Sequence, residues 1–242
     1  MRLDAFLYER GFTASRNEAK NLILSGCVSV GGKTVKKPAF DVADGEESVL
    51  LCRPGDSFVS RGGKKLQGAL DAFGIDPKDR LCIDIGASSG GFTDCLLKHG
   101  AGRVLAVDSG SGQLADAIRS DPRVLVYENY NARYLLSEDF PYAPDLAVMD
   151  VSFISATLIL PALYEILSYG ADFVLLIKPQ FEVGRAHVGK GGIVKDEKAR
   201  AAACKHVIAF AENVGFVSRG CIPSPITGGD GNVEYLAYFT KG

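Results

Sequence analysis

The chain has 242 residues, of which 47% are hydrophobic and 9% aromatic, so it can bury a core and is not expected to be disordered. It contains no run of 18 apolar residues, and charged residues interrupt its first segment, MRLDAFLYERG, so we expect neither a membrane span nor a signal peptide. Its six cysteines form no CxxC pair and its three histidines are scattered. We therefore expect reduced thiols, no metal site and a cytoplasmic protein.

The charge is unevenly distributed. The first 40 residues hold seven Lys or Arg against three acidic residues, a charge of +4, although the whole chain carries −2. A basic segment on an acidic protein suggests a polyanionic partner, but an ordinary solvated surface explains the charge equally well.

The first 50 residues predict two helices and a hairpin. A helix begins near Leu3 and ends at Gly11, and a second one starts at Ser15, where Glu18 completes a capping box. The segments CVSV and KTVKKP flank two glycines as hairpin strands. With RLDAFL, SRNEAKNLILSGCVSVGGK and KP, this stretch resembles the small RNA-binding domain named after the fourth protein of the small ribosomal subunit. The resemblance implies RNA contacts from the basic residues Arg2, Arg16, Lys20, Lys33, Lys36 and Lys37.

A short strand at 48–51 and a linker near Pro54 end this domain, so we predict domains at 1–56 and 57–242. The second domain alternates strands with helices, which predicts an α/β fold with a parallel sheet covered on both faces. Two final strands without a helix between them predict an antiparallel hairpin at the sheet edge. This combination is typical of methyltransferases that use S-adenosylmethionine (SAM). The predicted strands are 81–86, 103–108, 123–128, 145–150, 172–178, 215–224 and 233–240, and the helices are 90–100, 112–120, 155–168 and 196–215.

The segment CIDIGASSGGFTD combines a strand, a glycine-rich turn and the start of a helix. Glycines let the backbone approach a ligand, and the helix start offers free N–H donors. The spacing is neither GxGxxG nor that of a phosphate-binding loop, which argues against NAD and ATP. Asp84 could hold an ammonium group, Asp108 could accept ribose hydroxyls, and Asn129 or Asn131 could bind an adenine. The predicted SAM contacts are Asp84, Gly86, Ala87, Ser88, Gly90, Gly91, Phe92, Asp108 and Asn131.

Two charges end the strands 145–150 and 172–178. If these strands are neighbours, Asp150 and Lys178 lie roughly 5 Å apart, at the edge where α/β proteins hold their active sites. A modest surface salt bridge is the alternative. We also expect Lys65 to point inward from a helix, whereas Glu234 on the last strand could simply be solvated.

The segments VSRGGKKL, DIGASSGGFTD, VMDVSFIS, LIKPQFEVG, GKGGIV and GNVEY resemble the TlyA family, whose members are often labelled hemolysins and are similar to FtsJ-type ribose 2′-O-methyltransferases. The resemblance covers nearly the whole chain. It implies a catalytic tetrad of Lys65, Asp150, Lys178 and Glu234, and SAM-dependent 2′-O-methylation of cytidine in ribosomal RNA or ribosomal subunits. The short chain favours 23S over 16S RNA. ENYNAR replaces an Arg-Thr-Asn-like run of the family, which leaves the adenine contact open.

The residue types suit this chemistry, because a ribose hydroxyl must lose its proton to attack a methyl group. Lys178 is the expected general base, aimed by the turn that Pro179 fixes. Two other functions are considered: an RNA-binding ribosome assembly factor without catalysis, and a literal hemolysin. The sequence has no Trp and no amphipathic helix with a basic face beside an aromatic one, which argues against membrane lysis.

Overall fold

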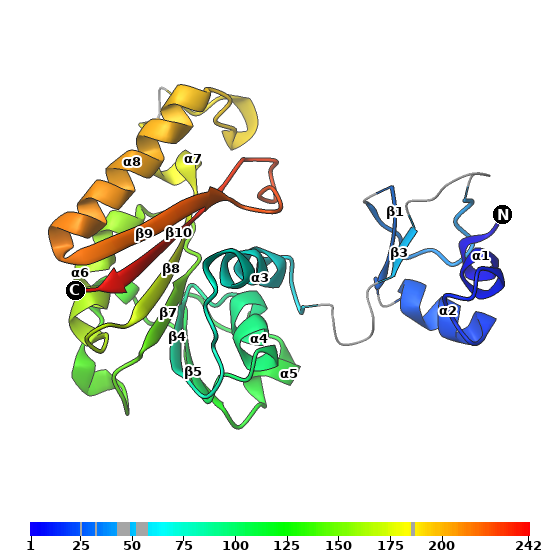
Figure 1. Cartoon of the computed structure of the whole chain (residues 1–242), viewed down its shortest axis with the longest axis horizontal. Helices are drawn as coiled ribbons and strands as arrows, with labels where there is room; N and C mark the ends of the chain where they lie inside the picture. Colours follow the sequence, from blue (N-terminus) through cyan, green and yellow to red (C-terminus); the bar gives the residue numbers. More distant parts are fainter. Residues whose placement is uncertain (25, 32, 43–48, 52–57, 185–186) are drawn as a thin grey trace. The chain divides into compact units, whose positions relative to one another are not determined.

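The computed structural model describes the chain except residues 25, 32, 43–48, 52–57 and 185–186. The protein divides into two compact units, Met1–Ser57 and Phe58–Gly242 (Figure 1). Each unit has its own hydrophobic core.

The first unit packs two helices on a small antiparallel sheet. At the start of α2 (Arg16–Leu24), the Ser15 hydroxyl accepts a hydrogen bond from the backbone N–H of Glu18 (3.2 Å), and the Glu18 carboxylate accepts one from Ala14 N–H (2.8 Å). Ser15 and Glu18 thus bond to each other's end of the first turn, as in the predicted capping box, except that Glu18 accepts from Ala14 N–H and not from the N–H of the cap residue Ser15. The predicted hairpin is confirmed, with Val30 opposite Lys33. The elements are α1 (Leu3–Glu9), α2 (Arg16–Leu24), β1 (Val28–Val30), β2 (Lys33–Thr34) and β3 (Val49–Leu51), in the strand order β2-β1-β3.

The second unit is built on a seven-stranded sheet in the order β6-β5-β4-β7-β8-β10-β9. Strands β4 to β8 are parallel, and β10 runs antiparallel to both β8 and β9. The predicted parallel sheet with a terminal antiparallel hairpin is therefore confirmed. The strands are β4 (Leu81–Ile85), β5 (Arg103–Val107), β6 (Val124–Tyr127), β7 (Leu146–Met149), β8 (Asp172–Ile177), β9 (Phe216–Pro223) and β10 (Tyr235–Lys241).

Helices cover both faces of this sheet (Figure 1). One face packs against α3 (Gly62–Phe73), α4 (Gly91–Lys98) and α5 (Asp116–Arg119), through residues such as Leu66, Leu96 and Ile118. The other face packs against α6 (Leu160–Ile166) and α8 (Glu197–Val214), through residues such as Leu163 and Val207. The short helix α7 (Pro179–Glu182) follows β8.

Two predicted helices are shorter than expected. The segment 155–168 is a 3₁₀ turn (Ala156–Leu158) followed by α6. A new helix starts there because Pro161 lacks an N–H and fits only a first turn. The segment 112–120 forms only α5, because the residues before α5 bond to other parts of the chain: Gly112 N–H donates to Glu128 Oε1 (2.9 Å) and Ala115 N–H to the Ser89 carbonyl (3.3 Å).

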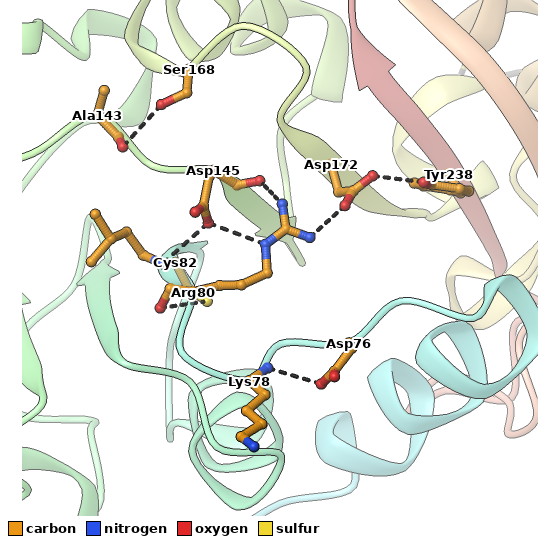
Figure 2. Close-up of polar contacts among 10 residues, drawn as sticks. Asp76, Lys78, Arg80, Cys82, Ala143, Asp145, Ser168, Asp172 and Tyr238 are labelled. Atoms are coloured by element: carbon orange, nitrogen blue, oxygen red, sulfur yellow. Dashed lines mark hydrogen bonds and ion pairs between the residues drawn. The ribbon is translucent and has the colours of Figure 1, made fainter.

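A polar cluster ties four strands together at the amino ends of the parallel strands (Figure 2). Arg80, just before β4, forms ion pairs with Asp145 before β7 (Nε to Oδ1, 3.2 Å) and with Asp172 at the start of β8. The hydroxyl of Tyr238 in β10 donates to Asp172 Oδ1 (2.6 Å). Burial, together with this bond, raises the pKa of Tyr238 to about 12. These contacts fix the register of β4, β7, β8 and β10 at the edge of the sheet opposite the carboxyl ends of the parallel strands.

Candidate active site

The four charged residues singled out from the sequence form two ion pairs. Lys65 Nζ lies 2.5 Å from Glu234 Oε2, and their side chains are 10% and 3% exposed. Lys178 Nζ lies 2.6 Å from Asp150 Oδ1, with side chains 11% and 20% exposed. Lys178 also donates a hydrogen bond to Ser152 Oγ (2.7 Å), a partner that the sequence did not suggest.

These residues come from four separate elements. Lys65 lies in the first turn of α3, and Asp150 directly follows β7. Glu234 immediately precedes β10, which begins at Tyr235. The prediction that Glu234 lies on the last strand is therefore wrong by one residue. Lys178 follows β8, where Pro179 begins α7. Since proline fits the first turn of a helix but cannot continue a paired strand, the chain must turn at Lys178.

Three adjoining cavities lie at this edge. The central cavity, about 520 Å³, is lined by Lys65, Asp150 and Lys178 together with the glycine-rich turn. The Asp108 cavity, about 340 Å³, shares Gly86, Ser88, Asp150 and Ser152 with it. The Phe153 cavity, about 280 Å³, shares Lys65, Lys178, Ser152 and Gly229 with it, and adds Glu234. Both ion pairs therefore border one connected cleft.

The glycines of the turn are required by the protein's own packing. A Cβ at Gly86, whose φ is +83°, would lie 2.4 Å from the backbone oxygen of Asp150. A Cβ at Gly91 would lie 2.1 Å from Ser60 Oγ, and one at Gly90 would meet Leu114. The closeness of the turn to the end of β7, the start of α3 and the region of α5 thus explains these glycines. Gly86, Ala87, Ser88, Gly91 and Phe92 line the central cavity, whereas Gly90 lines neither it nor the Asp108 cavity.

Asp84 lies behind the turn rather than in the cleft. Its side chain is fully buried, and Thr93 Oγ1 donates a hydrogen bond to its Oδ2 (2.6 Å). Its Oδ1 has no hydrogen-bond partner among the described residues. Burial is the main cause that raises the pKa of Asp84 to about 7, and the charge of Asp150 adds to it. Asp84 lines none of the three cavities, so we do not place it in contact with a ligand.

Asp108 and Asn131 both line the Asp108 cavity. Asp108 Oδ2 and Oδ1 accept hydrogen bonds from Ser88 N–H and Gly110 N–H, each at 2.7 Å, which hold the carboxylate in place. Each oxygen keeps a second lone pair for a hydroxyl donor. Asn131 Oδ1 caps the following 3₁₀ turn through Arg133 N–H (3.1 Å), which leaves its amide N–H groups directed elsewhere. Sequence reasoning singled out Asp150 but not the residues 151–154 after it, which also line this cavity.

The basic residues of the first unit serve in two ways. Arg2 and Arg16 both pair with Asp4, which is fully buried (Nε to Oδ1, 3.0 Å; Nη2 to Oδ2, 3.3 Å). The hydrogen bond from Arg2 lowers the pKa of Asp4. Lys20, Lys36 and Lys37 are exposed, and the side chain of Lys33 lies outside the described residues.

Among the described residues, no helix is both apolar enough and long enough to cross a membrane. Within the same residues, no group of three or more His, Cys, Asp or Glu side chains is arranged to hold a metal ion.

The fold and the cleft define a class of protein. A sheet with β10 reversed against five parallel strands, and a cleft bordered by a glycine-rich turn and a strand-ending acid, are those of the SAM-dependent methyltransferases. Residues 58–241 match the model of the FtsJ-like methyltransferase family, and residues 1–48 match that of the S4 domain.

Known relatives narrow this class. The 16S/23S rRNA (cytidine-2′-O)-methyltransferase TlyA of Mycobacterium tuberculosis is 46% identical over 98% of this chain and 88% of its own. The 23S rRNA (cytidine-2′-O)-methyltransferase TlyA of Campylobacter jejuni is 34% identical over the full length of both chains. A solved structure from Streptococcus thermophilus, 44% identical, covers 100% of this chain and 88% of that one with a TM-score of 0.76. The chain belongs to the TlyA family of FtsJ-like methyltransferases, as its motifs predicted.

Proposed function

We propose that this protein transfers a methyl group from SAM to the ribose 2′-hydroxyl of a cytidine in ribosomal RNA. The observation that carries the proposal is the placement of both Lys–carboxylate pairs on a cleft that continues into the Asp108 cavity. The M. tuberculosis and C. jejuni relatives, both named rRNA (cytidine-2′-O)-methyltransferases, support this substrate. We expect the large-subunit RNA as a substrate, and a cytoplasmic location where ribosomes are found.

The Asp108 cavity suits the adenosine part of SAM. The fixed carboxylate of Asp108 can accept hydrogen bonds from ribose hydroxyls, and the amide N–H groups of Asn131 can donate to a ring nitrogen. Bound SAM supplies a methyl group on a positively charged sulfur, an electrophile that needs no further activation. The protein's task is therefore to place and deprotonate the hydroxyl.

Lys178 is proposed as the general base. Once it has lost its own proton, its amine would accept the hydroxyl proton, and Asp150, whose Oδ1 lies 2.6 Å away, would stabilise the ammonium that forms. The hydrogen bond to Ser152 limits the positions that the amine can take. The ammonium of Lys65, which faces the same central cavity, is placed to stabilise the developing oxyanion. Glu234 holds Lys65 there.

Phe153 is proposed to receive the base of the target nucleotide. Its side chain is 92% exposed and lines both the Asp108 and Phe153 cavities. Proteins that act on a single nucleotide commonly stack its base on an aromatic ring. In the S4 domain, Lys20, Lys36 and Lys37 would contact backbone phosphates, which position the RNA without reading its sequence.

The test uses tritiated SAM and ribosomal subunits from cells that lack this gene. We expect methyl transfer to one or a few cytidines, located by mapping of 2′-O-methyl groups. Lys178→Ala should abolish transfer while SAM still binds, and Lys205→Ala, which changes an exposed lysine of α8, should not. If the unaltered protein binds subunits but transfers no label, the assembly-factor function would replace this proposal.

A further inference from the structure

The segment 150–156, which follows β7, is joined to the segment 178–182 at both ends. At one end, Lys178 contacts Asp150 and Ser152. At the other end, Glu182 Oε2 accepts a hydrogen bond from Ser155 Oγ (2.6 Å), and its Oε1 accepts one from Ala156 N–H (2.8 Å). Between these ends the rings of Phe153 and Phe181 pack with their centroids 5.2 Å apart.

Phe153 sits at the middle of this segment in an unfavourable state. Its φ is +64°, in the left-handed region that a bulky side chain rarely occupies. The residue is also 92% exposed, so burial does little to offset the strain. Such a conformation persists only where the surrounding structure holds it.

Glu182 is well placed to hold it. Ser155 Oγ lies 2.7 Å from Thr157 Oγ1 and caps the 3₁₀ turn that begins at Ala156. The Glu182 carboxylate therefore fixes both the cap and the first N–H of that turn. Without it, the segment would stay tied to Lys178 at one end and be released at the other. Glu182 lines none of the three cavities of the cleft, so it has no contact with reacting atoms.

We propose that Glu182 is a positioning residue that fixes the 150–156 segment and thereby presents the Phe153 ring to an unstacked pyrimidine base. The inference rests on the proposed function for the identity of the base. The geometry of the segment can be tested without any RNA, so failures of the two proposals are distinguishable.

The first experiment uses the absence of Trp from the chain. Phe153→Trp introduces a single fluorophore, whose time-resolved anisotropy reports motion of the segment. When Glu182→Ala is added to Phe153→Trp, the segment should be released at one end. The anisotropy of the Trp fluorescence should then gain a large fast component of decay. Adding Glu182→Gln should largely restore the slow decay, since the amide can accept from Ala156 N–H and donate to Ser155 Oγ.

The matched control is Tyr169→Trp, which places the probe on an exposed loop away from the cleft, where Tyr169 is 87% exposed. Its anisotropy should not respond to Glu182→Ala. If Glu182→Ala impairs folding, Ser155→Ala removes one of the two contacts and should produce a smaller effect in the same direction. Unchanged anisotropy at position 153 in both variants would overturn the inference.

The second experiment is a double-mutant cycle with undermethylated subunits. Glu182→Ala should raise the KM for the subunits roughly tenfold, within the range lost when base stacking is removed, and leave kcat and the Kd of SAM within about twofold. In the Phe153→Ala background it should have no further effect. If the increases in KM of the two single variants multiply in the double variant, or if kcat falls as much as KM rises, Glu182 acts by another route.

Discussion

Asp84→Asn tests how burial sets the ionisation of the carboxyl behind the glycine-rich turn. The folded protein raises the pKa of Asp84 from 3.8 to about 7, chiefly by burial. At about 1.4 kcal/mol for each tenfold change in proton affinity, this corresponds to roughly 4 kcal/mol. The side chain is fully buried, so solvent screening does not reduce the effect.

The sign follows from proton binding. Between pH 3.8 and about 7, the folded state retains a proton that the unfolded chain has lost. The free energy of unfolding therefore falls as pH rises through this window, and it stays low above pH 7. An asparagine cannot ionise, so the free energy of unfolding of the variant does not fall with pH for this reason. Its stability relative to the natural protein should rise by roughly 3 kcal/mol between pH 5 and pH 8.

The assay is urea denaturation at several pH values between 5 and 8.5, followed by circular dichroism at 222 nm. The asparagine can still accept from Thr93, but its N–H group could lack a partner, at a cost of roughly 1–3 kcal/mol that does not vary with pH. The decisive quantity is therefore the pH dependence of the difference between the two proteins. Asp71→Asn, which alters an exposed carboxylate, is the matched control. A difference that stays constant from pH 5 to pH 8 would refute the reasoning.

Three further outcomes are expected. Lys65→Ala leaves Glu234, 3% exposed, without its ion pair and should lower the free energy of unfolding by roughly 3–5 kcal/mol in urea denaturation; no loss would mean that water replaces the lysine. Arg80→Ala should lower stability by roughly 1–3 kcal/mol but leave the Kd of SAM unchanged in calorimetry, because its cluster lies at the other sheet edge; weakened SAM binding would contradict this separation. Lys36→Ala and Lys37→Ala should each reduce the salt dependence of RNA binding by about one counterion without changing the melting temperature, and an unchanged salt slope would place the RNA elsewhere.

The sequence was sufficient to predict the sheet and the Asp150–Lys178 contact, because parallel strands that are neighbours bring their carboxyl ends to one edge. The Lys65–Glu234 contact could be inferred only from the resemblance to a family, since 168 intervening residues separate its partners. The sequence singled out the glycines of the turn as SAM contacts, which stays a prediction, and it did not indicate their role in packing. Their spacing gives no sign that Gly86 packs on the backbone of Asp150.

The conformation of the segment 150–156 could not be predicted, and the reason is physical. A left-handed phenylalanine is disfavoured by every local preference, so no local pattern marks Phe153. Its conformation depends on Glu182, 27 residues from Ser155 in sequence, through contacts that form only after β7 and β8 have paired. Residues of this kind become visible only in the folded structure.

Charge at strand ends is by itself a weak guide to function in this protein. Arg80, Asp145 and Asp172 gather at one edge of the sheet as closely as Asp150 and Lys178 do at the other. The two clusters differ in access. The first joins strands to one another and lines none of the three cavities, whereas the second borders all three through Asp150 or Lys178. Because a proton can be transferred only to a group that a substrate can reach, the cleft rather than the ion pairs assigns the chemistry to the carboxyl edge.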